Sequence, residues 1–409
     1  MNILAAQSGG PTAAINASLA GVIEKAAQLW PNGKIYGGCN GIQGVLEEHI
    51  VDLKATFCPD GKPDKDLLSR LAVTPAMYLG SCRYRMKNYE DDPSDYEVFF
   101  DIVDKLNIDA FFYIGGNDSM DTVQMLSDYA EANGKNLKIV GVPKTIDNDL
   151  MGIDHTPGFG SAARFVATEV REIALDTDIY LNDSVVIVEI MGRDAGWLTA
   201  ASALARMDGS AAPHLIYLPE LGFDTEDFLR KVKTNLFRYH HVVACVSEGL
   251  KDVNGEYLLA DRSKVDKFGH TALAGTGRYL RDQVATRIGC KVRCVELNVT
   301  QRAAGHCASG TDLKESRQLG AQAVSLAEAG ESGVMASLKR TSDEPYTVEY
   351  GSVDVHDVAD RVKTVPLSWI TPDETGVTEE MIQYLRPLIE GDPDIPEKDG
   401  LPDYLRRKI

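Results

Sequence analysis

Short apolar runs bounded by turn residues are the feature that most restricts how this chain can fold. They lie at residues 1–6, 110–114, 138–142, 184–190, 215–218 and 241–246. Each run is almost continuously apolar, as expected for parallel strands that are covered on both faces. Longer helical patterns separate them, at residues 15–29, 121–133 and 159–176. The alternation of strand, glycine-rich turn and helix predicts a doubly wound α/β fold with mainly parallel sheets.

Composition is that of a soluble globular protein and argues against two classes of partner. The chain has 409 residues, of which 44% are hydrophobic and 25% charged, which is ordinary for a globular protein. Its formal net charge of −19 repels nucleic-acid phosphates, so we expect no nucleic-acid partner. No apolar run reaches the ~20 residues that span a bilayer, and the N-terminus does not resemble a signal peptide. The seven scattered cysteines fit reduced thiols. We therefore expect a cytoplasmic enzyme that does not bind a membrane.

Two segments lack the apolar runs and helical patterns of the rest. Residues 331–354 are polar and rich in turn residues, so we expect them to form a surface excursion. Residues 391–409 are rich in Pro, Asp and Lys, a composition that predicts a tail that either follows the surface or is partly disordered.

Two Gly-Gly turns follow predicted strands and precede predicted helices. Residues 8–16 read Ser-Gly-Gly-Pro-Thr-Ala-Ala-Ile-Asn, and residues 113–120 read Tyr-Ile-Gly-Gly-Asn-Asp-Ser-Met. Glycines after a strand let the backbone approach a phosphate, and the helix N-terminus supplies N–H donors. The alternative is a tight turn without a ligand. Asp118 and Ser119 either cap the second helix or lie at a Mg²⁺ site, since Mg²⁺ favours oxygen ligands beside substrate phosphates.

A dense run of charged and polar residues follows the predicted strand at 138–142. Asp147 and Asp149 are separated by one residue, and Lys144 and Thr145 lie just upstream. In an extended segment the two carboxylates face the same side and can enter one pocket, where one acts as general base and the other orients it or binds metal. Lys144 offers a compact positive charge to a phosphoryl group. The alternative is a turn stabilised by Asp and Asn side chains, but the density of these residues favours a functional site.

Three further polar segments lie at the ends of predicted strands. One contains Met191, Gly192 and Arg193, where the glycine lets the chain turn and the arginine can bind phosphate oxygens. Glu248 and Arg302 follow other strands. The alternatives are a surface ion pair for Arg193, a helix cap for Glu248 and a solvated charge for Arg302. Ligands of open α/β sheets bind outside the carboxyl ends of strands, so we expect the polar segments to converge on one crevice.

Together these motifs resemble the phosphofructokinase family. They occur in family order: Ser-Gly-Gly at 8–10, Gly-Ser-Cys-Arg at 80–83, Gly-Gly-Asn-Asp-Ser at 115–119, Pro-Lys-Thr-Ile-Asp-Asn-Asp at 143–149, Met-Gly-Arg at 191–193, Ser-Glu-Gly at 247–249 and Gln-Arg at 301–302. The resemblance implies two Rossmann-like domains that face a central cleft, in a homodimer or homotetramer. We expect a phosphoryl-donor domain at 1–158 plus about 302–345, a sugar-phosphate domain at about 159–301, and a C-terminal segment at about 346–409 that packs across both and ends in a polar tail.

The resemblance also implies roles for individual residues. Asp147 is similar to the general base that takes the proton from the sugar 1-hydroxyl, and Asp149 to the carboxylate that supports it. The other implied catalytic residues are Thr145, Lys144 and Arg193. The phosphoryl-donor contacts are Gly10, Arg83, Asp118, Ser119 and Lys144, with Asp118 also as metal ligand. The sugar-phosphate contacts are Thr145, Met191, Gly192, Arg193, Glu248, Arg302 and Arg293, the last supplied by a neighbouring subunit.

Two positions bear on the identity of the phosphoryl donor. ATP-using members of the family have glycine where this chain has Asp118 and Lys144. An anionic side chain at the first position repels the α-phosphate of ATP, and a lysine at the second fills that space and favours pyrophosphate. The pair resembles the pyrophosphate-dependent branch, which implies reversible, Mg²⁺-dependent phosphoryl transfer from pyrophosphate to fructose 6-phosphate. The alternatives are an ATP-dependent phosphofructokinase and a catalytically silent regulator that binds sugar phosphates.

The chain departs from the family pattern at two of its binding positions. Asn117 stands where the family usually has an aspartate associated with Mg²⁺, and Mg²⁺ is usually bound through carboxylates. Asp118 or the pyrophosphate itself must then balance more of the metal's charge. Ser184 aligns with a second arginine that bacterial ATP-dependent members bring from the neighbouring subunit. The contacts to the sugar 6-phosphate are therefore expected to differ, and activity on related sugars such as sedoheptulose 7-phosphate stays open.

Overall fold

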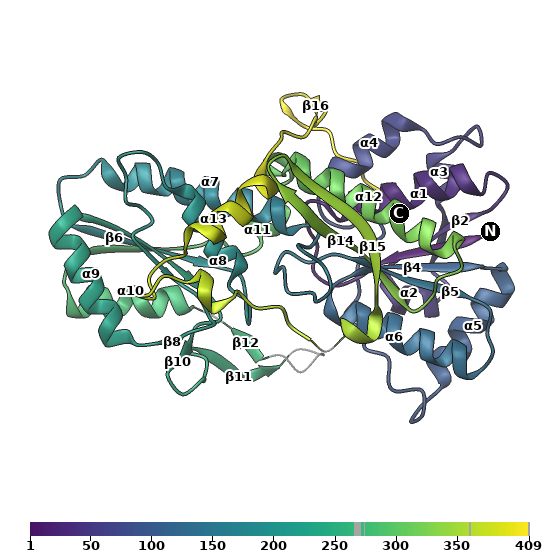
Figure 1. Cartoon of the computed structure of the whole chain (residues 1–409), viewed down its shortest axis with the longest axis horizontal. Helices are drawn as coiled ribbons and strands as arrows, with labels where there is room; N and C mark the ends of the chain where they lie inside the picture. Colours follow the sequence, from purple (N-terminus) through teal and green to yellow (C-terminus); the bar gives the residue numbers. More distant parts are fainter. Residues whose placement is uncertain (266–270, 274, 360, 408–409) are drawn as a thin grey trace. The chain divides into compact units, whose positions relative to one another are not determined.

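The structure, a computed structural model, describes residues 1–265, 271–273, 275–359 and 361–407 (Figure 1). The chain forms two compact units. The first unit comprises Met1–Ser161, Arg302–Arg361 and Glu390–Ile409, and the second comprises Ala162–Gln301 and Val362–Ile389. The boundaries expected after residue 158 and before residue 302 fall close to these breaks. The segment expected at 346–409 is shared between the two units.

The first unit is built on a seven-stranded sheet with the order β15-β14-β5-β4-β1-β2-β3. Its strands are β1 (Ile3–Gln7), β2 (Ile35–Gly38), β3 (Ile50–Asp52), β4 (Ala110–Gly115), β5 (Lys138–Pro143), β14 (Val334–Asp343) and β15 (Tyr346–Asp354). Neighbouring strands from β14 to β2 are parallel, whereas β15 and β3 add antiparallel edges. Every residue of β1 and β4 is buried, as expected for strands covered on both faces. The strands predicted at 1–6, 110–114 and 138–142 are confirmed.

Helices cover both faces of this sheet. Figure 1 shows α1, α4 and α12 above β4 and β5, and α5 and α6 below them. The helices of the unit are α1 (Ile15–Leu29), α2 (Gly41–Leu46), α3 (Leu53–Phe57), α4 (Lys65–Val73), α5 (Ser94–Leu106), α6 (Asn117–Ala132) and α12 (Gly310–Glu328). Helix α12 packs so tightly on α1 that a Cβ atom at Gly21 would lie 1.9 Å from the carbonyl oxygen of Arg317. Because α12 also contacts β5, a late segment of the chain is fixed beside an early strand.

The second unit has a four-stranded parallel sheet with the order β13-β6-β9-β7. Its strands are β6 (Ser184–Ile190), β7 (Leu215–Tyr217), β9 (His241–Ser247) and β13 (Lys291–Glu296), and its helices are α7 (Phe159–Asp178), which begins in the first unit, α8 (Trp197–Ala201), α9 (Thr225–Tyr239), α10 (Thr276–Arg287) and α13 (Glu379–Leu385). Figure 1 shows α7 and α13 above β6, and α9 and α10 below it. The strands predicted at 184–190, 215–218 and 241–246 are confirmed.

Short elements complete the two units. They are β8 (Gly222–Phe223), β10 (Lys251–Asp252), β11 (Ala260–Val265), β12 (Thr271–Leu273), α11 (Thr300–Ala303), β16 (Glu397–Lys398), β17 (Leu401–Pro402), and the 3-10 turns η1 (Ser202–Ala205), η2 (Gly305–Cys307), η3 (Val355–Asp357), η4 (Leu367–Trp369) and η5 (Arg386–Ile389). Among the described residues, no helix is both long and apolar enough to cross a membrane.

The segment at 331–354 is not the surface excursion that its polarity predicts. It forms the long β14–β15 hairpin, and β14 joins the sheet by pairing in parallel with β5 at Val334 and Met335. Polar and apolar residues alternate along β15, whose residues are alternately exposed and partly buried over most of its length. Such alternation is the pattern of a strand with one solvated face, so a high polar content was compatible with a sheet edge.

The C-terminal tail is ordered against the first unit over the residues that the structure describes. Asp403 accepts a hydrogen bond from Arg70 Nη2 at 2.8 Å, the Leu405 N–H donates to Thr74 Oγ1 at 2.9 Å, and Arg407 donates to a main-chain carbonyl at 3.3 Å. Of the two possibilities predicted for the tail, the structure shows the one that follows the surface.

Candidate active site

Three predicted polar segments meet at one edge of the first unit's sheet. Strands β4, β1 and β5 are neighbours around β4 and run parallel, so their carboxyl ends lie together. Main-chain hydrogen bonds join the loops just past these ends: the Ser8 N–H donates to Ile114 O, and the Lys144 N–H donates to Gly115 O, both at 2.9 Å. The structure therefore brings together the Ser-Gly-Gly, Gly-Gly-Asn-Asp-Ser and Lys-Thr-Ile-Asp-Asn-Asp segments.

Lys144 reaches from the end of β5 to the Gly-Gly turn after β1. Its side chain is only 3% exposed, and its Nζ donates to the carbonyl oxygen of Gly10 at 2.8 Å. Gly9 has a φ of 80°, which favours glycine. A Cβ atom at Gly9 would also lie 3.0 Å from the Lys144 Nζ. The turn thus needs glycine both for its backbone and for the close approach of the ammonium group.

Charges of both signs act on the ammonium group of Lys144. Burial lowers the pKa of Lys144 to about 8, against the opposing effect of Asp147 and Asp149, and Arg302 lowers the pKa further. A Cβ atom at Gly10 would lie 3.2 Å from Arg302 Nη1, so this guanidinium group is at the same turn. The protein thus concentrates two cations where its net negative charge would otherwise repel a phosphate. The contact of Arg302 with the sugar 6-phosphate stays a prediction. The sequence did not predict that Arg302 lies beside Gly10.

The turn that carries the predicted base is held by hydrogen bonds between side chains and the main chain rather than by a strand. Asn148 has a φ of 56°, in the left-handed region that Asn tolerates, so the expectation of an extended segment was wrong. The Asp147 N–H donates to Thr145 Oγ1 at 3.1 Å, and Asn148 Oδ1 accepts from the Thr156 N–H at 3.0 Å. Both Asp147 and Asp149 are near enough to act on Lys144. The two carboxylates therefore share one neighbourhood, because of the turn and not because of strand alternation.

The loop after β4 provides the oxygen atoms that suit a metal. Asn117 Nδ2 donates to Asp149 Oδ2 at 3.1 Å, while its buried Oδ1 has no hydrogen-bond partner among the residues that the structure describes. Asp118, the next residue, is exposed. Ser119 is 2% exposed and lies against Gly115, where a Cβ atom would be 1.9 Å from its Oγ. An amide oxygen and a carboxylate fit a hard cation such as Mg²⁺, whereas Ser119 packs against the turn.

Arg83 extends from a loop that touches the same Gly-Gly turn. Ser81 Oγ donates to the Gly9 carbonyl oxygen at 2.7 Å, and Asn40 Nδ2 donates to Ser81 O at 3.2 Å. Arg83 itself is exposed, and its predicted contact with the donor stays a prediction. Sequence reasoning did not single out Ser81, although it stands inside the Gly-Ser-Cys-Arg motif that carried part of the resemblance.

The Met-Gly-Arg segment lies in the second unit, at the carboxyl ends of β6 and β9. The Gly192 N–H points to Glu248 Oε1 at 3.4 Å, and the Met191 N–H donates to Gln301 Oε1 at 3.1 Å. Gly192 has a φ of 136°, a value that favours glycine. Helix α10 begins after Gly275, without a side-chain cap, so Glu248 is not the cap of that helix. Gln301 is a supporting residue that sequence reasoning left without a separate role.

Arg293 lies on β13, far along the sequence from the Met-Gly-Arg turn. Its Nη1 is 3.0 Å from Asp176 Oδ2, and its guanidinium carbon is 5.7 Å from the centre of the Tyr180 ring. The side chain remains 41% exposed. Its exposed position is compatible with the role in a neighbouring subunit that the family resemblance implies, which stays a prediction.

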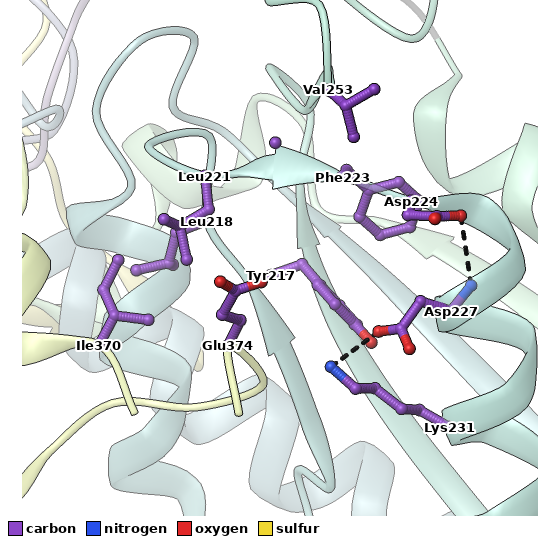
Figure 2. Close-up of a pocket in the computed structure, with 11 residues that line it drawn as sticks. Tyr217, Leu218, Leu221, Phe223, Asp224, Asp227, Lys231, Val253, Ile370 and Glu374 are labelled. Atoms are coloured by element: carbon purple, nitrogen blue, oxygen red, sulfur yellow. Dashed lines mark hydrogen bonds and ion pairs between the residues drawn. The ribbon is translucent and has the colours of Figure 1, made fainter. Parts of the chain in front are cut away.

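A hollow of about 320 Å³ lies in the second unit, at the carboxyl end of β7, and contains none of the predicted site residues. Figure 2 shows its wall formed by Tyr217, Phe223 and Asp227, with Ile370 on the opposite side. Its lysine, Lys231, pairs with Asp227 at 2.8 Å. The lining is mostly apolar and acidic. Its lysine is already paired with a carboxylate, so the hollow lacks the positive charge that a phosphate needs.

Comparison with known proteins identifies the class to which this fold and these loops belong. The family described as Phosphofructokinase matches residues 2–327, and the chain belongs to that family. A pyrophosphate–fructose 6-phosphate 1-phosphotransferase of Xanthomonas campestris is 40% identical over 410 residues, which cover 100% of this chain and 96% of that protein. One of the same name from Methylococcus capsulatus is 39% identical over 408 residues, covering 99% and 95%. The crystal structure of a pyrophosphate-dependent phosphofructokinase from Marinobacter aquaeolei matches with a TM-score of 0.87 and 34% identity, covering 100% of this chain and 98% of that one.

Proposed function

We propose that the protein catalyses reversible, Mg²⁺-dependent phosphoryl transfer from pyrophosphate to the 1-hydroxyl of fructose 6-phosphate, giving fructose 1,6-bisphosphate and phosphate, a step of glycolysis in the cytoplasm. One observation carries the choice of donor. The buried Lys144 ammonium lies 2.8 Å from the Gly10 carbonyl oxygen and occupies space that a glycine at position 144 would leave open. The names of the full-length relatives support the same donor and acceptor.

The chemistry at the acceptor is proton transfer coupled to phosphoryl transfer. The Asp147 carboxylate accepts the proton of the sugar 1-hydroxyl while that oxygen attacks the nearer phosphorus of pyrophosphate. The new O–P bond forms as the bridging P–O bond breaks, and phosphate leaves with its electron pair. Lys144 neutralises charge on the donor, and Asp149, bonded to Asn117, holds the turn of the base. Catalysis is then mainly positioning and charge neutralisation.

The proposed contacts to the sugar phosphate are those that the family resemblance implies. Thr145, next to Asp147 in the catalytic turn, faces the acceptor in this proposal. The other proposed contacts are Met191, Gly192, Arg193, Glu248 and Arg302, with Arg293 from a second subunit. Glu248 and Gly192 are already paired, which presents a carboxylate and a main-chain turn, groups suited to sugar hydroxyls. Arg193 and Arg302 supply the positive charge that phosphate oxygens need.

Mg²⁺ fits the oxygen atoms of the β4 loop. When bound, the metal neutralises and orients the phosphate oxygens of the donor. Asp118 and the Oδ1 atom of Asn117 are the groups proposed to hold it. Among the described residues, no group of three or more His, Cys, Asp and Glu side chains could hold a metal ion. Mg²⁺ is usually bound by one or two protein groups together with substrate phosphates.

A purified-enzyme assay with both donors tests the function. With fructose 6-phosphate and Mg²⁺, we expect kcat/KM for pyrophosphate to exceed that for ATP by roughly 10³, because Asp118 opposes the α-phosphate and a like-charge contact costs several kcal/mol. Faster turnover with ATP would establish the ATP-dependent alternative. Binding of the sugar phosphate without turnover by either donor would instead indicate a silent regulator, although such a protein has no need of the Asp147 and Asp149 pair.

We also propose that the protein works as a homo-oligomer. In the last turn of α7 and the residues just after it, Leu175, Ile179 and Leu181 are 53%, 70% and 99% exposed. Arg293 forms an ion pair with Asp176 in the same stretch. A group of exposed apolar side chains is typical of a surface that binds protein. The family resemblance implies that an arginine at position 293 serves the neighbouring subunit, so a second copy of this chain is the partner that fits.

Mixing two defective variants distinguishes shared from separate sites when activity is assayed at a fructose 6-phosphate concentration well below the raised KM of Arg293→Ala, where neither variant alone turns over appreciably. Arg293→Ala is expected to raise KM for fructose 6-phosphate, and Asp147→Ser to abolish turnover. In a dimer with shared sites, co-expression of the two variants regenerates one intact site in each hybrid, and random pairing restores about a quarter of wild-type activity. If each subunit binds its sugar with its own Arg293, every hybrid site keeps one defect and no activity returns. Sedimentation of the wild type supplies the control for assembly.

A further inference from the structure

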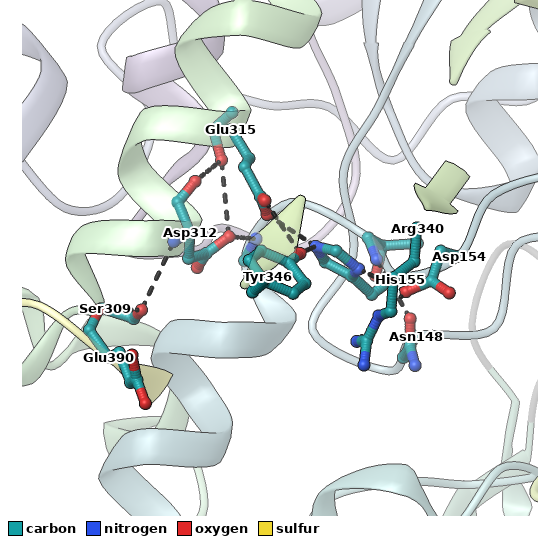
Figure 3. Close-up of polar contacts among 12 residues, drawn as sticks. Asn148, Asp154, His155, Ser309, Asp312, Glu315, Arg340, Tyr346 and Glu390 are labelled. Atoms are coloured by element: carbon teal, nitrogen blue, oxygen red, sulfur yellow. Dashed lines mark hydrogen bonds and ion pairs between the residues drawn. The ribbon is translucent and has the colours of Figure 1, made fainter. Parts of the chain in front are cut away.

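A cluster of charged side chains lies near Asn148, the residue that follows Asp147 (Figure 3). At its centre is His155, which is 3% exposed. Its Nδ1 lies 2.8 Å from Asp154 Oδ1, and its Nε2 lies 2.6 Å from Glu315 Oε2. A carboxylate can only accept, so each ring nitrogen has to donate to its partner, and only the doubly protonated imidazole does both. The geometry therefore defines His155 as a buried cation held between two carboxylates.

Each carboxylate of the cluster has a second donor. The Tyr346 hydroxyl donates to Glu315 Oε1 at 2.9 Å, and Arg340 Nη2 lies 3.3 Å from Asp154 Oδ1. Arg340 also lies over the Tyr346 ring, 5.1 Å from its centre. Further titratable groups that act on the cluster are Asp312 on α12, Asp343 on β14 and Tyr350 on β15. Helix α12 and both strands of the β14–β15 hairpin thus converge on Asp154 and His155.

Electrostatics agree with the protonated form of His155. Burial on its own lowers the pKa of His155, but the hydrogen bonds to Asp154 and Glu315 outweigh it and raise the pKa above its ordinary 6.5. A raised pKa means that folding favours the cation. This stabilisation is complete at pH values below the ordinary pKa and is lost as the pH rises through the raised one.

The residues that follow His155 are bonded to both sides of Asp147. The Thr156 hydroxyl donates to the Thr145 carbonyl oxygen at 2.7 Å, and the Thr156 N–H donates to Asn148 Oδ1 at 3.0 Å. The Thr145 N–H donates in turn to Pro157 O at 3.1 Å. The position of the base is therefore set by the segment that begins at His155.

The same segment is anchored to α12 beyond this point. Asp312, one turn before Glu315 on α12, accepts from the N–H groups of Gly158 and Ser161, both at 2.9 Å. Residues three apart on a helix lie on one face, so these two carboxylates hold the segment together, and Figure 3 shows them side by side on the helix. His155 is the cationic contact of this anchor, and the other contacts are main-chain or hydroxyl donors.

We propose that the His155 cation is a positioning residue for phosphoryl transfer, which fixes the 154–158 segment on α12 and, through Thr156, keeps Asp147 aligned with the sugar hydroxyl. Loss of the proton leaves one ring nitrogen lone pair facing a carboxylate and removes the charge that separates Asp154 from Glu315. The anchor then loosens, and with it the turn. A misplacement of ~1 Å in a catalytic group costs about 100-fold in rate, so the effect belongs to kcat and not to substrate binding.

The test compares His155→Gln with His356→Gln. His356 is also placed between two carboxylates, 2.7 Å from Asp354 and 3.0 Å from Asp128, but its side chain is 52% exposed. We expect His155→Gln to lower kcat by about 100-fold with less than a threefold change in KM for fructose 6-phosphate, and to speed amide exchange in the peptide 142–150. His356→Gln is expected to leave both unchanged.

A third variant, Glu315→Gln, separates positioning from a purely structural role. It keeps a hydrogen-bond acceptor but removes the charge, so the pKa of His155 falls and the alkaline limb of kcat, measured at saturating donor, moves to lower pH. If His155 had only a structural role, Glu315→Gln would lower kcat by the same factor at every pH and leave the alkaline limb at the same pH. An unmoved limb in Glu315→Gln, or wild-type kcat and exchange in His155→Gln, overturns the proposal. The measurements of kcat and KM in this test rest on the proposed function. If the wild type transfers nothing from pyrophosphate, that function fails, and the exchange data still decide the role of His155.

Discussion

Replacing Asp147 with serine is expected to lower kcat by about 10³- to 10⁴-fold while KM for fructose 6-phosphate changes little. General-base catalysis contributes ~10²–10⁴ in rate, and serine cannot accept the proton at neutral pH. The Asp147 N–H bond to Thr145 Oγ1 involves the main chain, so the turn keeps this contact in the variant. Steady-state kinetics in the direction of fructose 1,6-bisphosphate formation measure both constants.

The matched control is Asp101→Ser, at an exposed position on α5 in the same unit. It removes the same charge from the chain without touching the β1, β4 and β5 loops, and should keep wild-type kcat. The reverse reaction offers a second reading, because by microscopic reversibility the base that takes the proton forward returns it as an acid in reverse. A near-normal rate in Asp147→Ser in either direction would remove Asp147 from the role of base.

The central strands were predictable because burial on both faces leaves a strong local signal. Strands β1, β4, β6 and β9 are apolar along almost their full length. The strand expected before Arg302 could not be given bounds, because β13 lies at the edge of its sheet and reads Lys-Val-Arg-Cys-Val-Glu. The β14–β15 hairpin was missed because its polar residues resemble those of a loop. Edge strands have one solvated side, and their polarity hides them.

The candidate site could be predicted where its residues form a contiguous motif. Lys144, Asp147 and Gly10 stood out because phosphate chemistry needs a lysine, a carboxylate and a close backbone at strand ends. His155 carried no such signal, since its partner Glu315 is 160 positions away in the chain and reaches it only because α12 folds back beside β5. Contacts of this kind depend on the tertiary fold and not on local sequence.

The approach of Asp147 and Asp149 to Lys144 was expected for the wrong reason. Strand alternation was to align the two carboxylates, but Asn148 turns the chain in the left-handed region, and its side chain ties that turn to Thr156. An Asn between two Asp residues favours a turn, so the pattern contained both the functional and the structural interpretation. In this chain they are the same feature.

Replacing Lys144 with methionine is expected to lower kcat/KM for pyrophosphate by about 100-fold, because a charged hydrogen-bond donor to phosphate contributes ~1.5–3 kcal/mol. The pKa of Lys144 is lowered to about 8, so the wild-type kcat/KM for pyrophosphate should fall as the pH rises through that value and the ammonium loses its proton. Methionine cannot titrate, and the variant should lack this fall. The pH profile of kcat/KM reports the pKa values of the free enzyme. The fall expected from Lys144 can therefore be distinguished from any change in kcat.

The Lys144→Met variant should not melt below the wild type, because burial disfavours the lysine's charge and methionine removes that cost. Loss of activity at an unchanged melting temperature then reflects the donor site and not unfolding. Lys65→Met, at an exposed position on α4, is the matched control. The single variant should stay inactive with ATP, since Asp118 still opposes an α-phosphate, whereas the double variant Lys144→Gly with Asp118→Gly should gain turnover with ATP. If Lys144→Met keeps the wild-type pyrophosphate profile, the lysine does not select the donor.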